Sequence, residues 1–115
     1  MTPGSIVVVD WRDALPDSGE PNKQRPAVVV GRADLFHRDF GYLLVVPLTG
    51  DATMRVSEAS VEIAPTKENH CSKRCFALSW SVQTVPKRRV RGTKARVTTA
   101  QLNELRDQIA RLVER

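Results

Sequence analysis

Two short stretches of the chain place a polar side chain at the end of an apolar strand. In the first, Arg25 and Pro26 stand between a charged loop and the β-branched run of residues 27–30. In the second, an apolar run over residues 43–48 ends in Thr49. Strand ends of this kind hold a side chain firmly at the rim of a sheet, where an anionic ligand can reach the planar guanidinium of an arginine. The two stretches therefore predict an anion-binding site built from Arg25 and Thr49.

The basic residues of the chain are concentrated in one segment. The net charge is +5, yet no acidic residue occurs between Asn69 and Asn103, and the rest of the chain carries −3. This segment holds Lys73, Arg74, Lys87, Arg88, Arg89, Arg91, Lys94 and Arg96. A segregated basic tract favours a polyanionic partner, usually nucleic acid. An acidic protein partner, or a solvated face with no ligand, would fit the same charges.

Two cysteines occur in the segment His70-Cys71-Ser72-Lys73-Arg74-Cys75. Their spacing resembles half of a structural zinc site, but the chain has no second ligand pair, and His37 is the only other histidine. We therefore expect two reduced thiols and no metal or other cofactor, with a regulatory disulfide as the alternative.

Length and composition predict one domain over residues 1–115, large enough for a single hydrophobic core. Because only 5% of the residues are aromatic, that core must be aliphatic. No apolar run approaches the roughly 20 residues that span a membrane. The first residues lack the basic and apolar regions of a signal peptide, so we expect a cytoplasmic protein with no membrane partner.

The apolar runs predict a mainly β fold that ends in a helix. The expected strands cover residues 5–11, 26–31, 42–49, 56–63, 76–85 and 94–97, with a polar loop over residues 13–24. Thr98 and Gln101 form a capping box. Apolar residues follow at helical spacing and are expected to pack on the sheet: Leu102, Leu105, Ile109, Leu112 and Val113. This order favours a small, partly open β-barrel over an alternating β–α fold.

Several motifs, taken in order, resemble the MazF/PemK family of toxin endoribonucleases. They are the opening strand of residues 4–10, Gly19-Glu20 with Arg25-Pro26-Ala27, Pro47-Leu48-Thr49, Val82-Gln83-Thr84-Val85 and Arg91-Gly92. The resemblance covers nearly the whole chain. It implies an SH3-like barrel of the CcdB–MazF type. It also implies sequence-specific, ribosome-independent cleavage of single-stranded RNA by attack of the 2′-OH, without metal.

The resemblance also implies roles for individual residues. RNA cleavage needs a base for the 2′-OH and donors for the charge that grows on the phosphorane. Arg25 is expected to stabilise that charge, Thr49 to donate a hydrogen bond, and Glu20 to help as the base. The expected RNA-binding residues are Trp11, Lys23, Trp80, Gln83, Arg88, Arg89 and Arg91, with core burial as the alternative for Trp11.

One position departs from the family pattern. Trp80 and Ser81 stand where the late strand of the family usually carries Asp-Gln. An indole at this place can stack on an unpaired base, or it can belong to the core.

The family further implies a homodimer whose RNA groove spans the interface, and an antitoxin whose acidic, disordered tail covers that groove. Two other functions remain open. One is a CcdB-like, gyrase-poisoning toxin, although residues 111–115 lack the Trp-Gly-Ile ending of those proteins. The other is an RNA-binding barrel without catalytic activity.

Overall fold

The computed structural model describes residues 1–11 and 24–115. The polar loop expected over residues 13–24 lies outside these ranges, apart from Gln24, which begins a strand. Glu20 and Lys23 therefore lie outside the described residues, and the roles predicted for them stay predictions.

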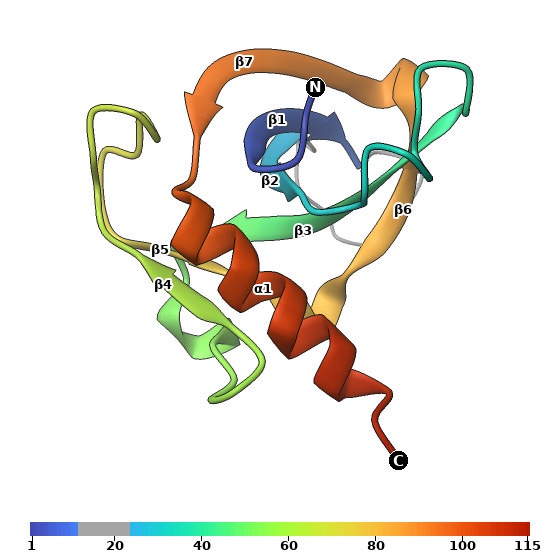
Figure 1. Cartoon of the computed structure of the whole chain (residues 1–115). Helices are drawn as coiled ribbons and strands as arrows, with labels where there is room; N and C mark the ends of the chain where they lie inside the picture. Colours follow the sequence, from blue (N-terminus) through green and yellow to red (C-terminus); the bar gives the residue numbers. More distant parts are fainter. Residues whose placement is uncertain (12–23) are drawn as a thin grey trace.

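Within the described ranges the chain forms seven strands, one α-helix and three short 3₁₀ turns (Figure 1). The strands are β1 (Ser5–Asp10), β2 (Gln24–Val29), β3 (Tyr42–Thr49), β4 (Val61–Ile63), β5 (Cys75–Ala77), β6 (Gln83–Pro86) and β7 (Val90–Arg96). The turns are η1 (Ala52–Met54), η2 (Ser79–Ser81) and η3 (Lys87–Arg89), and the helix is α1 (Thr99–Leu112). None of the helices in these ranges has the length and apolar character needed to cross a membrane.

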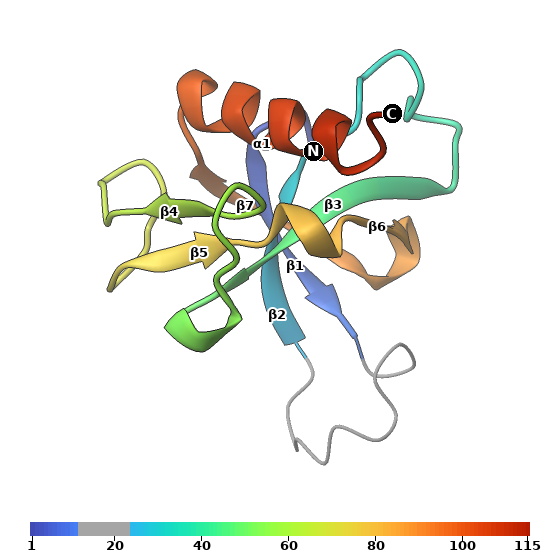
Figure 2. The same cartoon turned by 90° about the horizontal axis from the view of Figure 1, so that it is seen from below.

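The strands form one strongly curved antiparallel sheet that does not close. Its order is β4-β5-β3-β2-β1-β7, and β6 pairs with β3 beside β5. The first and last strands of the chain are neighbours, with Ser5 opposite Arg96 and Val9 opposite Val90. Figure 2 shows α1 lying along one side of this sheet. The predicted fold, a mainly β, partly open barrel with a C-terminal helix, is confirmed.

β3 exchanges its partner part-way along one edge. Residues Tyr42 to Val45 pair with β6, whereas Leu48 and Thr49 pair with β5. Pro47 lies at the changeover, and its carbonyl oxygen accepts the Leu78 N–H at 2.9 Å. Because proline has no N–H, the strand loses no ladder hydrogen bond where its partner changes. This explains physically why a proline is tolerated within a central strand.

Both faces of the central strands are buried, which accounts for their continuous apolar sequences. Alternate residues of β1, such as Val7 and Val9, join one aliphatic cluster, while Ile6 joins the other. The second cluster also contains Leu102 and Leu105 of α1. The helix therefore covers one face of the sheet, as predicted, and the Thr98–Gln101 capping box begins it.

The single strand predicted over residues 76–85 is wrong, because the structure divides it into β5, η2 and β6. β5 pairs with one half of β3 and β6 with the other, so the chain needs a connection between them. The turn η2 provides it beside Pro47. Residues 75–79 are all buried, so this part of the segment has no exposed face.

Two smaller predictions also need correction. The strand expected over residues 56–63 is restricted to β4, because residues 56–60 turn back on themselves: Glu58 has a φ of 69°, and Ser60 Oγ donates to the Val56 carbonyl oxygen at 2.7 Å. The prediction that Leu112 and Val113 pack on the sheet is also wrong. These side chains are 43% and 82% exposed, because the last turn of α1 projects past the sheet (Figure 1).

Candidate functional site

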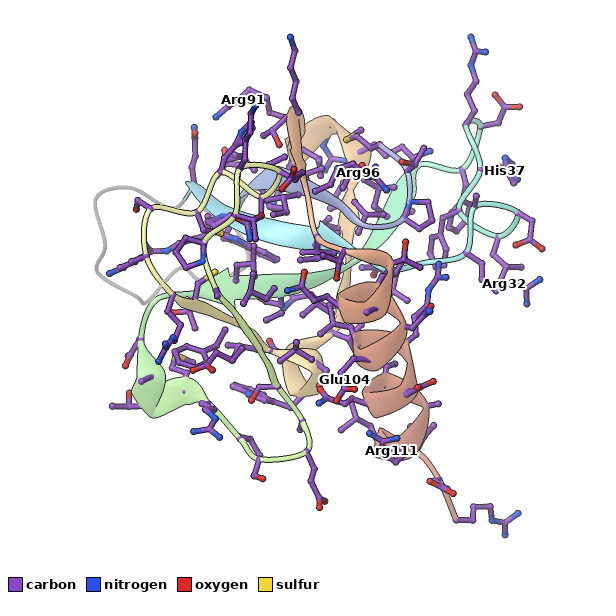
Figure 3. All side chains as sticks on the ribbon, turned by 60° about the vertical axis from the view of Figure 1, so that its left-hand side comes forward. Arg32, His37, Arg91, Arg96, Glu104 and Arg111 are labelled. Carbon is purple, nitrogen blue, oxygen red and sulfur yellow. The ribbon has the colours of Figure 1, made fainter. Side chains whose placement is uncertain are left out.

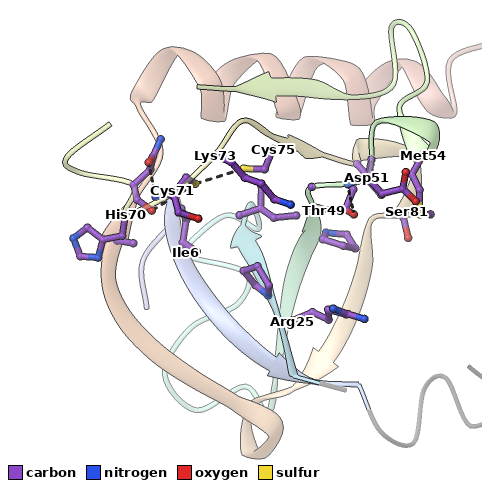
Figure 4. A pocket seen from close by; sticks show the side chains of 18 of the residues that line it. Ile6, Arg25, Thr49, Asp51, Met54, His70, Cys71, Lys73, Cys75 and Ser81 are labelled. Atoms are coloured by element: carbon purple, nitrogen blue, oxygen red, sulfur yellow. Dashed lines mark hydrogen bonds between the residues drawn. The ribbon is translucent and has the colours of Figure 1, made fainter. Parts of the chain in front are cut away.

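A broad groove of about 970 Å³ opens beside the end of β3. Its lining comes from β2, β3, η1, η2 and β7, and from the loop that precedes β5. The predicted residues Trp11, Arg25, Thr49, Trp80 and Gln83 all lie along it. Segments that are distant in sequence are thus brought together around one surface (Figure 4).

Arg25 and Thr49 face the groove from neighbouring strands. In the β2–β3 register Ala27 lies opposite Pro47 and Val28 opposite Val46. The pairing ends there, two residues after Arg25 in β2 and two residues before Thr49 in β3, and both residues line the groove. The guanidinium is exposed, and the hydroxyl is half-buried. A cation and a hydroxyl donor that line one groove from neighbouring strands can bind oxygens of one phosphate.

The Thr49 hydroxyl is oriented by the turn that follows β3. Its Oγ1 accepts the Asp51 backbone N–H at 3.1 Å, which leaves the hydroxyl hydrogen available for a ligand. The Asp51 carboxylate accepts the Thr53 hydroxyl at 2.6 Å and the Thr53 N–H at 2.9 Å, and it caps η1. These hydrogen bonds lower the pKa of Asp51, so its carboxylate is ionised at neutral pH. Its task is to hold the turn.

Trp80 belongs to the groove wall and not to the core. Its side chain is 41% exposed, and its Nε1 donates to the Met54 carbonyl oxygen at 3.1 Å. The hydrogen bond fixes the indole against η1 while part of its ring faces solvent. Trp11 differs, because it is only 4% exposed and packs with the apolar cluster that includes Val7 and Val9. Trp80 can offer a face to a base, whereas Trp11 serves mainly as packing.

Arg88, Arg89 and Arg91 lie in a separate depression of about 240 Å³. Asp10 and Gln24 line it as well, while Arg25, the next residue of β2, lines the main groove. Successive residues of a strand point to opposite faces, so the two hollows lie on opposite sides of the β2 rim. These three arginines are therefore not part of the groove that contains Thr49.

The basic tract does not form one continuous surface. Lys87 Nζ donates to the carbonyl oxygens of His37 and Arg38, at 2.7 and 3.3 Å. Arg96 donates to Thr2, Pro3 and Ser5 near the N-terminus. In Figure 3 Arg91 and Arg96 lie at different places on the molecule. Lys87 and Arg96 thus bind backbone or side-chain oxygens of the protein, and binding of a polyanion by the tract stays a prediction.

Comparison with known proteins identifies the family. A sequence profile described as the PemK-like, MazF-like toxin of type II toxin-antitoxin systems matches residues 2–113. The chain belongs to this toxin family. No match was found among curated protein sequences.

Solved structures share the fold of this PemK/MazF-like chain. A MazF from Deinococcus radiodurans has a TM-score of 0.73 at 22% identity, over 98% of this chain and 96% of its own. A MazE–MazF complex from the same organism has a TM-score of 0.69 at 18% identity, over 98% of this chain and 94% of its own. An endoribonuclease in complex with its cognate antitoxin, from a mycobacterial species, has a TM-score of 0.70 at 17% identity, over 96% of this chain and 92% of its own.

The PemK/MazF-like groove also includes residues to which the sequence analysis assigned no individual role in RNA cleavage or base recognition. They are Asp51, Asn69, His70 and Lys73, contributed by η1 and by the loop before β5. Asp51 lies two residues after the Pro-x-Thr motif, so its place at the rim was open to inference from that motif. The other three come from a loop whose path depends on β4–β5 pairing, which has no local sequence signal.

Proposed function

We propose that this PemK/MazF-like toxin is an endoribonuclease that cuts single-stranded RNA without a metal ion. The observation that carries the proposal is that Arg25 of β2 and Thr49 of β3, two neighbouring strands, both line one open groove. A groove open to solvent admits a chain, whereas an enclosed cavity would restrict the ligand to a small molecule.

In the proposed reaction, the 2′-OH of the nucleotide before the cut attacks the neighbouring phosphorus. The guanidinium of Arg25 donates to the phosphate oxygens on which negative charge grows, and the Thr49 hydroxyl donates a further hydrogen bond. Glu20, which the resemblance suggests as the base for the 2′-OH, precedes Arg25 by five residues in the sequence. The bond from phosphorus to the 5′-oxygen breaks and that oxygen takes up a proton, so the products would be a 2′,3′-cyclic phosphate and a 5′-hydroxyl.

Base recognition would come from the opposite wall of the groove. Trp80 is held against η1 with part of its indole exposed, and an exposed aromatic face stacks on an unpaired base. Gln83 lies beside it, and its Nε2 donates to the Ser81 carbonyl oxygen at 3.1 Å, which leaves its Oε1 for a base edge. Lys23, Arg88, Arg89 and Arg91 would bind phosphates before and after the cut.

Family membership also suggests the partners. Two of the similar structures are toxin–antitoxin complexes, and an antitoxin with an acidic, disordered tail would compete with RNA for the same cations. We expect a homodimer in the cytoplasm, with the RNA path shared between protomers.

The test is incubation of the purified protein with a long RNA in excess EDTA. Cuts at a defined short sequence, with 5′-hydroxyl ends, support the proposal. The same RNA with a 2′-deoxy nucleotide at the cut site should stay intact. Cleavage of the deoxy-substituted RNA, or a strict Mg²⁺ requirement, contradicts the mechanism. RNA binding without cutting would support a non-catalytic barrel, and neither binding nor cutting would favour a gyrase-directed toxin.

A further inference from the structure

Two free thiols lie at the edge of the groove. The Sγ atoms of Cys71 and Cys75 are 3.5 Å apart, and both residues line the same hollow as Arg25 and Thr49 (Figure 4). This separation brings two sulfurs into contact without a covalent bond, since a disulfide needs about 2.0 Å.

Both ends of the loop that carries these thiols are held in place. Cys75 is the first residue of β5, opposite Ile63 of β4. At the other end, Asn69 is only 3% exposed; its Oδ1 accepts the backbone N–H groups of Thr66 and Cys71, and its Nδ2 donates to the Ala64 carbonyl oxygen. The thiols meet because anchored backbone on both sides brings them together.

The loop between the thiols places the ammonium group of Lys73 in the groove. Lys73 packs so closely over Gly50 that a β-carbon added there would lie 2.7 Å from Lys73 Cε and 3.0 Å from Nζ. Gly50 directly follows Thr49, so the ammonium group is held near the Thr49 hydroxyl (Figure 4). A side chain at position 50 would displace the exposed end of Lys73, and a shift of residues 71–74 would also alter this approach.

We propose that Cys71 and Cys75 form a reversible disulfide when the protein is exposed to peroxide. Formation of this disulfide displaces Lys73 from Gly50 and lowers the affinity of the groove for RNA. The thiol chemistry is independent of the proposed ribonuclease function, whereas its effect on RNA rests on that function.

The two thiols divide the chemistry between them. Cys71 is half-exposed and is the sulfur that peroxide reaches. Cys75 is buried; burial first, and then the contact with Cys71, raises its pKa to about 12, so it stays protonated until the second step. An exposed attacking thiol and a protected second thiol are the arrangement that favours a disulfide over further oxidation.

The reaction balances with one hydrogen peroxide. The Cys71 thiolate attacks one peroxide oxygen, the O–O bond breaks, and hydroxide leaves, which converts Cys71 to a sulfenic acid. The Cys75 sulfur then bonds to the Cys71 sulfur while the S–O bond breaks, and the Cys75 proton leaves with that hydroxide as water. The hydroxide released first takes up the proton that Cys71 lost when it became a thiolate. Each sulfur loses one electron and the peroxide gains two, so two thiols and one peroxide give one disulfide and two waters.

Closure must move the loop and not the strand. The two sulfurs have to approach by about 1.5 Å to reach bonding distance. Cys75 is fixed by its pairing in β5, so the displacement falls on residues 71–74. Lys73 lies in the middle of that segment, so its side chain no longer packs over Gly50. This removes one phosphate-binding cation from the groove.

The first measurement follows the thiols alone. Full-length protein is treated with hydrogen peroxide, and free thiols are counted with the intact mass. Wild type should lose both thiols and the mass of two hydrogen atoms, and dithiothreitol should restore them. Cys71→Ser should form no intramolecular disulfide. Persistence of both thiols in the wild type, or stable sulfinic acid in place of a disulfide, overturns the proposal whether or not the protein cuts RNA.

The second measurement follows RNA affinity, using an uncleavable RNA with 2′-deoxy substitution so that catalysis is not needed. Oxidation of the wild type should reduce the slope of log affinity against log salt by about 0.7, the value for one lost single-strand phosphate contact. Lys73→Met should show the same reduced slope before oxidation and no change after it. Lys94→Met is the matched control, since Lys94 is exposed on β7 outside the groove, and it should keep the response.

The outcomes separate the two proposals. Disulfide formation with unchanged affinity in the wild type, or a Lys73→Met variant that still responds to peroxide, overturns the role given to Lys73. A reduced protein that binds no RNA at all counts against the proposed function, while the thiol measurement still decides whether the disulfide forms.

Discussion

Ser79 and Gln108 are joined by a buried hydrogen bond: the Ser79 hydroxyl donates to Gln108 Oε1 at 2.6 Å, and the two side chains are 0% and 3% exposed. Gln108 Nε2 in turn donates to the Ser60 carbonyl oxygen at 2.9 Å. Ser79 begins η2, the turn that carries Trp80 into the groove. Helix α1 therefore positions one wall of the site from behind.

This polar contact should be costly to break from one side only. Gln108→Leu leaves the Ser79 hydroxyl buried without its acceptor, and such a group costs about 1–3 kcal/mol. The double variant Ser79→Ala with Gln108→Leu removes both partners and should lose less stability than Gln108→Leu alone. Urea unfolding of Gln108→Leu, Ser79→Ala and the double variant measures this. Simple additivity of the two single changes would show that the pair is not coupled.

The stability that helix α1 adds to the fold should depend on Leu105 and much less on Leu112. Leu105 is 0% exposed within the core, so Leu105→Ala should lower the free energy of unfolding by about 2–5 kcal/mol. Leu112→Ala removes the same atoms at a site that is 43% exposed, and it should cost much less. Equal losses in thermal unfolding would mean that the end of α1 is covered in solution.

Arg25→Ala should abolish RNA cleavage with little change in melting temperature, because the side chain is exposed at a strand end. Arg25→Lys should also be strongly impaired, since an ammonium cannot reproduce the two parallel hydrogen bonds of a guanidinium. Arg38→Ala, an exposed arginine of the β2–β3 connection, is the control. Full activity of Arg25→Lys would show that charge alone is needed.

Thr49→Val should lower the cleavage rate by a factor of about 10²–10³, as expected for one lost donor to a developing oxyanion. The change also removes the acceptor of the Asp51 N–H, so Thr49→Ser serves to separate the two effects. Thr49→Ser keeps the hydroxyl and should restore most of the rate in single-turnover assays. Equal losses in both variants would assign the effect to the methyl group and the shape of the turn.

Replacing Arg88, Arg89 and Arg91 with alanine should weaken RNA binding for all sequences alike. Each lost phosphate contact should reduce the salt slope by about 0.7. Because these residues lie across the β2 rim from the groove, the choice of cleavage sequence should not change. A changed cleavage sequence would place a base, and not only the backbone, in the second hollow.

Much of this architecture could be predicted from local patterns. The ends of β3, the capping box at Thr98 and the burial of Leu102 and Leu105 follow from apolar periodicity and short-range hydrogen bonding. The rim positions of Arg25 and Thr49 follow from strand ends. These features depend on residues close to one another in sequence.

The features that were missed depend on contacts between distant residues. The break at η2 arises because β3 changes its partner at Pro47, and the burial of Gln108 arises because Ser79 and Ser60 lie beneath it. The close approach of Lys73 to Gly50 requires the loop anchored by Asn69. No window of consecutive residues contains both members of these pairs.

The pairing of β1 with β7 has a consequence for synthesis. Residues near the start of the chain find their partners some ninety positions later, at Ser5 opposite Arg96, and β7 also supplies Thr93 and Ala95 to the groove. Contacts this far apart in sequence make folding slow, because a long loop must close before they form. While the ribosome still translates the segment before β7, the nascent chain therefore lacks the residues that β7 contributes to the groove.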